Sequence, residues 1–585
     1  MIEIQKKIEK LVKDATAKSG PIDFVIEHPK ELVHGDYSTN VGLVLAKKIG
    51  DEIGKKVNPR QVSELLVEKM KNNLPEEVEI IEIAGPGFIN FRLKPEFFRV
   101  SLNEILEKEQ DFGKNRSLKN DAVLIEYTDP NPLKQFHIGH LMSNAIGEAL
   151  SRLYTWNGAT VHRMCYQGDV GMHVAKALYG IQKNIDKMPG NSATLEEKMR
   201  FLGDAYVLGA EKFDGETATE ESKSEITKIN KKVYQFYNER ENTDPDLELL
   251  YNTGKKWSLQ HFEEIYAKLG TSFDSFVMES TTFEIGEKIV RSNIGKVFDE
   301  SEGAIIYKGE KDGLHTRVFI SREGLPTYES KDLGLAVYKH KTNRHDKSVI
   351  ITADEQREYF KVVLSALSKI EPEISRKTEH ITHGMMQFTD GKMSSRKGNV
   401  ITGESLLSDI EAMVSEKISD RDLDDSERQE IISKVSVASL KYSILKQAPG
   451  KNIIFNSDQA LSFEGDSGPY VQYTYTRAKS VIEKAAVEKK IPNPKKIPEG
   501  WQTTNLEKML YQFPELIEKS LVERGPHNLV TYATQLAGEF NSYYGNTQII
   551  DGGIDEGYKL AIVRATMIVL RNCLHVLGMK SPDKM

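Results

Sequence analysis

The chain has 585 residues, a formal net charge of −8, 39% hydrophobic residues and 28% charged residues. This composition fits a soluble globular protein of three or four domains. The negative charge argues against a general nucleic-acid binder, although local basic patches could still meet such a partner. No apolar run approaches the length that a membrane span needs.

The chain has only two cysteines, Cys165 and Cys573. Two distant thiols provide neither a zinc-ligand cluster nor a disulfide framework, so we expect no zinc. Residues 1–7 contain no apolar signal core, and we therefore expect no export. Together these features predict a protein of the reducing cytoplasm.

Residues 1–112 predict a small α+β domain. Its expected elements are helices over 1–18, 41–46 and 59–70, a strand at 23–27, and a hairpin formed by 78–84 and 88–93. The hairpin turn is Gly85-Pro-Gly87, and both flanking segments alternate apolar with polar residues. The charged stretch 104–118 is interpreted as a linker.

Residues 120–400 alternate strands with helices, a pattern typical of a parallel α/β sheet. Expected strands cover 122–127, 161–166 and 348–352, and the last is followed by a helix to about 370. The alternation breaks over about 185–300, where long charged helices predict an insertion into the sheet domain. No motif in this insertion could be interpreted.

The remainder is predicted to be mostly helical. We expect a helical connective region over 401–460 and an all-α bundle over 461–585. Amphipathic segments within them are 425–445, 470–489, 506–520, 528–544 and 558–577.

Residues 131–140, Asn-Pro-Leu-Lys-Gln-Phe-His-Ile-Gly-His, lie between the first strand of the sheet domain and its helix. Parallel sheets bind ligands at the carboxyl ends of their strands, and a helix N-terminus favours phosphate. His137 and His140 add donors there, and Gly139 leaves room for a flat base. This predicts a nucleotide site, although a His-x-Gly-His string also occurs by chance.

A second stretch, residues 384–399, follows the last strand of the sheet domain. It places Lys392, Arg396 and Lys397 among Gly, Ser and Asn residues, with no period of a buried helix or strand. Such a loop suits a triphosphate whose charge shifts during reaction. Alone it could be a solvated basic loop; its pairing with the histidine turn favours the functional interpretation.

These two stretches resemble the HIGH and KMSKS signatures of class I aminoacyl-tRNA synthetases, and the whole chain resembles the arginyl-tRNA synthetase family. The resemblance extends to 126–131 before the histidine turn, 166–169, 328–332, the N-terminal 34–40 and 84–90, and the C-terminal 463–473. It implies a Rossmann-like catalytic domain, a small α+β N-terminal domain and an all-α anticodon-binding bundle.

Three positions depart from the family pattern. Thr128 stands where the family usually has a small residue. Ser395 stands where many class I enzymes carry the second signature lysine. Arginyl-tRNA synthetases often carry a lysine before the HIGH turn instead, and Lys134 occupies that place. Asp129 stands where the family usually has serine, so its role is open.

The resemblance implies that the chain activates L-arginine with ATP and transfers it to the terminal 2′-hydroxyl of tRNA(Arg). The implied catalytic residues are His137, His140, Lys134, Lys392 and Arg396. The implied ATP-binding residues are Gly139, His137, His140, Gly168, Asp169, Met385, Lys392, Ser394 and Ser395. The implied arginine-binding residues are Glu126, Asp129, Pro130, Asn131, His140, Tyr328, Asp332 and Gln356.

For Asp332 a second role is open, because a carboxylate directly before the apolar run 333–337 could cap a helix. Tyr470, Tyr473 and Arg477 are candidates for stacking on tRNA bases, as are Tyr475, Tyr543 and Tyr544. At least half of these tyrosines are expected to belong to the core of the bundle.

We expect Mg²⁺ to be carried with ATP, no metal held by a protein cage, no membrane contact and a monomer. The alternative functions are a catalytically silent tRNA-binding paralog and a nucleotidylyltransferase outside translation. The intact basic and histidine residues argue against the first, and the length of the chain argues against the second.

Overall fold

The computed structural model describes residues 2–29, 31–238, 244–389 and 402–585. Its N-terminal module is a four-stranded antiparallel sheet in the order β1-β2-β4-β3, with helices packed on it. The predicted hairpin is confirmed as β3 and β4. The elements are α1 (Ile2–Thr16), β1 (Ile26–Glu27), β2 (Tyr37–Thr39), α2 (Val41–Ile53), α3 (Pro59–Met70), β3 (Val78–Ala84) and β4 (Phe88–Leu93).

The stretch interpreted as a linker contains the end of a helix, so that prediction is wrong. Helix α4 (Pro95–Lys108) packs against α19 (Asn505–Leu510) and α22 (Glu556–Val576) of the C-terminal part. After α4, Glu109 pairs with Arg564 at 2.6 Å. The charges face solvent while Phe98, Leu102 and Ile105 are buried, which is how an amphipathic helix resembles a charged linker in sequence.

The middle of the chain forms the predicted parallel sheet. Its five strands lie in the order β12-β11-β5-β6-β7, and all pairs are parallel. The strands are β5 (Ala122–Glu126), β6 (Thr160–Gln167), β7 (Ser275–Met278), β11 (Lys347–Ala353) and β12 (Thr378–His383). Helices α5 (Ile138–Trp156), α11 (Tyr328–Thr342), α12 (Arg357–Ile370) and α13 (Pro372–Lys377) accompany them.

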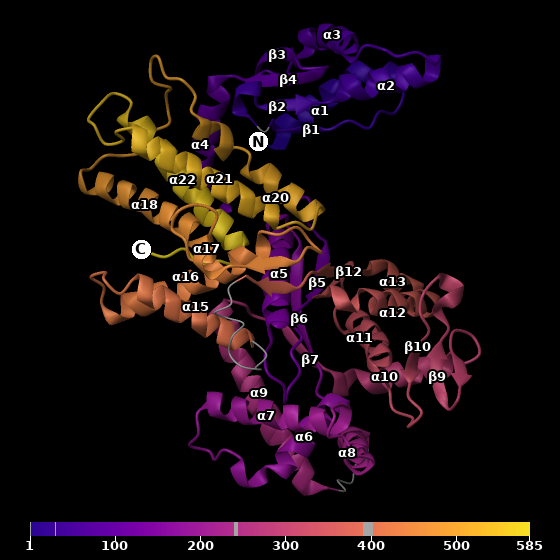
Figure 1. The fold of residues 1–585 in the computed structure, drawn as a ribbon. Helices are drawn as coiled ribbons and strands as arrows, with labels where there is room; N and C mark the ends of the chain where they lie inside the picture. The colour runs from indigo at the N-terminus through magenta and orange to yellow at the C-terminus, as the bar shows by residue number, and fades with distance from the viewer. Residues whose placement is uncertain (1, 30, 239–243, 390–401) are drawn as a thin grey trace.

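Strand β7 lies inside the range that the sequence analysis assigned to the insertion. Four residues are too short a run to be recognised between long helices. The preceding helices, α6 (Met172–Lys183), α7 (Leu195–Asp214), α8 (Glu220–Asn238) and α9 (Pro245–Leu269), form the lowest lobe in Figure 1. After β7 come α10 (Glu279–Ser292) and a small antiparallel sheet of β8 (Asp299–Ser301), β9 (Ala304–Tyr307) and β10 (Arg317–Ile320).

The C-terminal part is helical, as predicted. It comprises α15 (Gly403–Lys417), α16 (Asp425–Leu445), α17 (Ser457–Ala460), α18 (Gly468–Val487), α19, α20 (Phe513–Val522), α21 (His527–Asn546) and α22. Strand β14 (Ile453–Phe455) pairs with β13 (Met386–Phe388). Within the described ranges, no helix is both long and apolar enough to cross a membrane.

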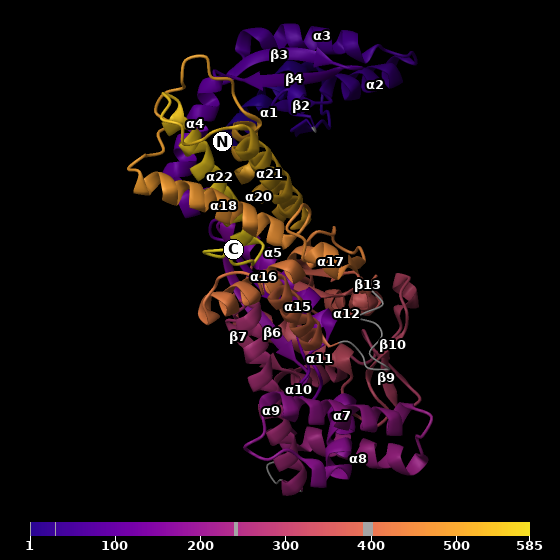
Figure 2. The same ribbon diagram turned by 60° about the vertical axis from the view of Figure 1, so that its left-hand side comes forward.

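The N-terminal module sits on the helical bundle rather than on the sheet, as both views show (Figures 1 and 2). Glu515 of α20 accepts hydrogen bonds from the Tyr37 hydroxyl at 2.5 Å and pairs with His28 at 2.8 Å. Tyr511 is fully buried against the module's core. The module therefore continues the elongated surface formed by the bundle and the sheet.

Helices α6 and α7 approach each other so closely that glycine is required at their contact. A Cβ atom added to Gly180 would lie 1.9 Å from the carbonyl oxygen of Ala205, and one added to Gly209 would lie 1.9 Å from that of Lys176. Rigid backbone atoms would have to separate.

We therefore predict that Gly180→Ala destabilises the insertion by about 1–3 kcal/mol and lowers the midpoint of thermal unfolding. Gly190→Ala is the matched control, because nothing lies within 4 Å of a Cβ atom added there. Equal midpoints for the two variants would show that this contact is looser than described.

Candidate active site

The histidine turn lies at the carboxyl end of β5, where α5 begins. The backbone N–H of His137 donates to Nδ1 of His140 at 3.1 Å, and the two rings stack with centroids 3.5 Å apart. Because Nδ1 of His140 accepts this bond, its Nε2 carries the proton and can donate to a ligand. A Cβ atom at Gly139 would lie 3.0 Å from the His137 ring, so glycine permits this stacking.

Both imidazoles are neutral near pH 7. Burial and the charge of Lys134 lower the pKa of His137 to about 4. His137 nevertheless keeps part of its surface exposed to solvent. Burial also lowers the pKa of His140 well below its ordinary value, with His137 and Lys134 contributing. The turn therefore offers neutral donors beside the ammonium of Lys134.

The segment leading into this turn is held in a strained conformation. Thr128, Asp129 and Leu133 have φ angles of 81°, 48° and 63°, a region that residues other than glycine rarely adopt. The Thr128 N–H donates to Ser143 Oγ at 3.0 Å, and the Leu133 N–H donates to Ser258 Oγ at 2.9 Å. Such strain persists where surrounding contacts enforce it, often at functional sites.

Asp129, which departs from the family pattern, lies just after the carboxyl end of the central strand β5. Its Oδ1 accepts the Tyr166 N–H at 2.7 Å. Burial, followed by the charge of Glu126, raises the pKa of Asp129 well above its ordinary range. Asp129 is therefore a carboxyl group whose charge is disfavoured until a cation approaches.

Two buried ion pairs join the carboxyl ends of strands β5 and β7 to helix α11. Lys339 Nζ lies 2.7 Å from Glu126 Oε2, and Lys331 Nζ lies 2.5 Å from Glu279 Oε2. All four side chains are at most 6% exposed. Glu126 was predicted to contact arginine, and in the structure its charge is already balanced by Lys339.

Asp332 lies on α11 between these lysines. The helix begins at Tyr328, so the alternative that Asp332 caps a helix start is wrong. Its Oδ2 accepts the Tyr359 hydroxyl at 2.5 Å. Burial raises the pKa of Asp332 to about 8, and the charge of Glu126 adds to the shift while the bond from Tyr359 opposes it.

Tyr328 is linked through His173 to Gly168, which lies in the turn that follows β6. Its hydroxyl lies 3.0 Å from Nδ1 of His173, whose Nε2 lies 2.8 Å from the Gly168 carbonyl oxygen. Because a carbonyl only accepts, Nε2 of His173 carries the proton and the Tyr328 hydroxyl donates. Burial, followed by the charge of Lys134, lowers the pKa of His173 to about 3.

Asp169, predicted to bind ATP, is wholly buried. Its carboxylate pairs with Lys255 at 2.6 Å and accepts bonds from the Ser280 N–H and hydroxyl and from the hydroxyls of Tyr237 and Tyr251. With both oxygens occupied by protein donors, Asp169 orients the turn and does not face a nucleotide. The predicted direct contact is therefore revised to a structural one.

The other predicted residues lie at the same sheet edge. Pro130 is buried and Asn131 half-buried, and a Cβ atom at Gly168 would lie 2.2 Å from Asn131 Oδ1. Gln356 and Met385 are exposed and follow β11 and β12.

Lys392, Ser394, Ser395 and Arg396 lie outside the described residues, but both ends of their loop are placed. On the entry side, β13 pairs with β14. On the exit side, Thr402 bridges to His137, and the Gly403 N–H donates to the Phe136 carbonyl oxygen at 2.8 Å. The chain that follows these residues therefore lies directly against the histidine turn.

In the bundle, Arg477 lies between two tyrosines, 4.7 Å from the ring of Tyr473 and 5.3 Å from that of Tyr544. Tyr470 accepts a bond from Asn541, which also accepts one from Arg477. Tyr475 is buried in the core, as expected for part of this set.

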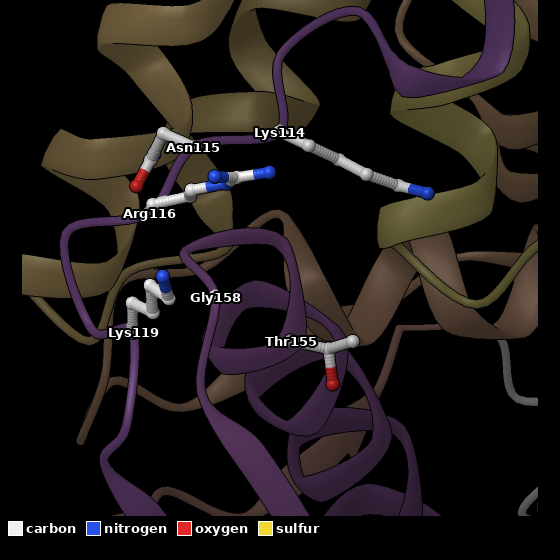
Figure 3. Close-up of a pocket in the computed structure, with 6 residues that line it drawn as sticks. All are labelled: Lys114, Asn115, Arg116, Lys119, Thr155 and Gly158. Atoms are coloured by element: carbon white, nitrogen blue, oxygen red, sulfur yellow. The ribbon is translucent and has the colours of Figure 1, made fainter.

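A separate basic hollow lies at the amino ends of the strands, opposite the histidine turn. Its volume is about 510 Å³, and Figure 3 shows its lining of Lys114, Asn115, Arg116, Lys119, Thr155 and Gly158. Four of these residues precede β5, Thr155 lies in the last turn of α5, and Gly158 follows α5. The hollow is therefore not part of the site at the carboxyl ends of the strands.

Three family models match the chain. The model of the class I (R) tRNA synthetase catalytic domain matches residues 101–457, the arginyl-tRNA synthetase N-terminal domain matches 3–93, and the DALR anticodon-binding domain matches 471–585. The chain belongs to the arginyl-tRNA synthetase family.

Full-length relatives agree. The arginine–tRNA ligase of Fusobacterium nucleatum is 30% identical, covering 99% of this chain and 98% of its own, and that of Halothermothrix orenii is 29% identical over all of both chains. The arginyl-tRNA synthetase structure from Thermus thermophilus superposes with a TM-score of 0.78 at 21% identity, covering 99% and 100% of the chains. That from Plasmodium falciparum gives 0.76 at 20% identity, covering 100% and 99%.

Sequence analysis missed four residues of the site: Lys331, Lys339, Glu279 and His173. Glu279 directly follows β7, a strand that was not recognised. The two lysines lie on either side of the apolar run 333–337, and lysine is almost never fully buried without a partner. That spacing was the available signal.

We predict that Lys339→Met destabilises the protein by about 3–5 kcal/mol, because it leaves the buried Glu126 carboxylate without a counter-ion. Thermal unfolding measures the loss. Adding Glu126→Gln should restore most of the stability, since the double variant carries no unpaired buried charge. A double variant as unstable as the single one would contradict the assignment.

Proposed function

We propose that this chain ligates L-arginine to tRNA(Arg) in two steps. The arginine carboxylate attacks the α-phosphate of ATP, forming arginyl-adenylate and releasing pyrophosphate. The terminal 2′-hydroxyl of the tRNA then attacks the arginyl carbonyl and AMP leaves. The observation that carries the proposal is the pair of carboxyl groups Asp129 and Asp332, which form no ion pair with a lysine among the described residues and lie at the same end of the strands as the histidine turn. The family of full-length arginine–tRNA ligases supports it.

For ATP, we propose that Gly139 and the backbone of Gly168 leave room for the nucleotide while His137 and His140 donate to its phosphates and ribose. Neutral imidazoles suit this task because they donate without holding the product by charge. Lys134, Lys392 and Arg396 would neutralise charge on the departing pyrophosphate. Met385, Ser394 and Ser395 remain proposed neighbours of the nucleotide.

For arginine, we propose that Asp332 and Asp129 balance the guanidinium and the α-ammonium, with Tyr328, Asn131, Pro130 and Gln356 around them. A guanidinium presents five donors in a rigid fork, so carboxylates recognise it by paired bonds. Lysine matches the charge but not the fork, and citrulline matches the shape but not the charge. Glu126 contributes negative potential while bonded to Lys339.

For tRNA, we propose that Tyr470, Tyr473 and Arg477 form a stacking platform for unpaired bases. The half-buried rings of Tyr470 and Tyr473, and the Arg477 guanidinium over the ring of Tyr473, support this role. We also propose the division into 1–112, 120–400, 401–460 and 461–585, a monomer, and residence in the cytoplasm. We propose that Mg²⁺ travels on the ATP phosphates.

The function is tested by exchange of labelled pyrophosphate into ATP with each standard amino acid, with and without tRNA(Arg). We expect exchange with arginine alone, and only when the tRNA is bound. Exchange with arginine in the absence of tRNA would remove the tRNA requirement. No exchange with any amino acid would instead favour the catalytically silent paralog.

In the same assay, His140→Ala should lower the rate about 100-fold or more, because it removes a fixed donor at developing charge. The exposed His315 in the small β-sheet lobe provides the control, and His315→Ala should retain the wild-type rate. Equal rates for the two variants would remove His140 from the reaction.

A further inference from the structure

We propose that Tyr206, on helix α7 of the insertion, is a positioning residue that holds the Lys134 ammonium beside the histidine turn. The helical insertion, for which the sequence showed no motif, would thereby contribute to arginine activation. This inference rests on the proposed role of Lys134 in neutralising pyrophosphate.

The loop that carries Lys134 is docked into the core of the insertion. The neighbouring Leu133 is fully buried in a cluster with Leu202 of α7 and Tyr251 of α9. A Cβ atom at Gly254 would lie 2.6 Å from Leu133 Cδ2, so α9 also approaches tightly. The strained φ of 63° at Leu133 turns its side chain into this core. The backbone at position 134 is therefore fixed by the insertion.

Helix α7 also fixes the side chain. Lys134 Nζ lies 4.6 Å from the centroid of the Tyr206 ring. One turn earlier, a Cβ atom at Gly203 would lie 2.4 Å from Gln135 Nε2. Residues three apart share a helix face, so Gly203 and Tyr206 together form the surface against which the loop rests.

An aromatic ring suits this task better than a carboxylate. A lysine side chain has four rotatable bonds and loses much conformational freedom when ordered. The ring attracts the ammonium through its quadrupole but carries no charge. Among the described residues, no carboxylate lies within ion-pair distance of Lys134. Its full positive charge therefore remains available to a phosphate.

The position of that charge fits the reaction. The charge of Lys134 contributes to the lowered pKa values of His137, His140 and His173, so the ammonium lies among all three histidines. The signature loop has Ser395 where a second lysine is common in class I enzymes. A Lys134 ammonium held in a fixed position would therefore contribute more to neutralising the charge on pyrophosphate.

The test compares two substitutions in the arginine-dependent exchange assay. Tyr206→Leu removes the ring, and we expect kcat to fall about 10-fold with the KM for arginine unchanged. Tyr206→Phe retains the ring and should restore a rate within about threefold of wild type. If both variants lose the same activity, the hydroxyl or the fold is responsible and the proposal is wrong.

Phe213→Leu is the matched control. Phe213 lies on the same helix and carries a similar contact, with Lys176 Nζ 4.7 Å from its ring, but away from Lys134. We expect Phe213→Leu to match Tyr206→Leu in thermal stability and wild type in rate. A Phe213→Leu rate as low as that of Tyr206→Leu would indicate a general effect of loosening α7.

A double-mutant cycle separates positioning from a structural effect. In the Lys134→Ala background, measured by single turnover, Tyr206→Leu should cause no further loss. A further 10-fold loss would overturn the proposal. Wild-type enzyme inactive with arginine would instead refute the proposed function, so the two failures are distinguishable.

Discussion

The acidic side of the site depends on two buried lysines of one helix. Lys331 and Lys339 of α11 balance Glu279, which follows β7, and Glu126, which ends β5. Without them, the cost of burying several like charges together would outweigh the packing that the sheet edge gains. With them, Asp129 and Asp332 form no ion pair with a lysine among the residues that the structure describes, and burial raises the pKa of both carboxyl groups. Arginine carries the two cationic groups that such a pair accommodates.

A second constraint joins the histidine turn to helix α15, which begins at Gly403. The Gly403 N–H bonds to the carbonyl of Phe136, directly before the histidine turn. Helix α9 reaches both, because Ser258 binds the loop before the turn and His261 pairs with Glu404 at 3.1 Å. Displacement of the histidine turn is thus resisted by both α9 and α15. The geometry that the chemistry needs is built into the backbone pairing before a substrate arrives.

Much of this was predictable from sequence because it rests on local pattern. Periodicity located the β3–β4 hairpin, most strands of the parallel sheet and the helical C-terminal part, and the histidine turn lay between a strand and a helix as expected. What failed depends on tertiary contacts. Four-residue β7 has no periodic signal, and the burial of Asp169 in a network with Lys255 is set by a helix 86 residues away. Tyr206 resembles any core aromatic until Lys134 is seen over its ring.

Asp129 and Asp332 form no ion pair with a lysine among the described residues, and we propose that they balance the guanidinium and the α-ammonium of arginine. At pH 7, below the value of about 8 for Asp332, this group is mostly protonated in the free site. A bound guanidinium favours the carboxylate, so binding must release the proton, and affinity must rise with pH until about pH 8. Calorimetry of arginine binding in buffers of different ionisation enthalpy measures this directly. We predict release of about one proton or more per arginine at pH 7, and less from Asp332→Asn. No release, or equal release from the variant, would contradict the account.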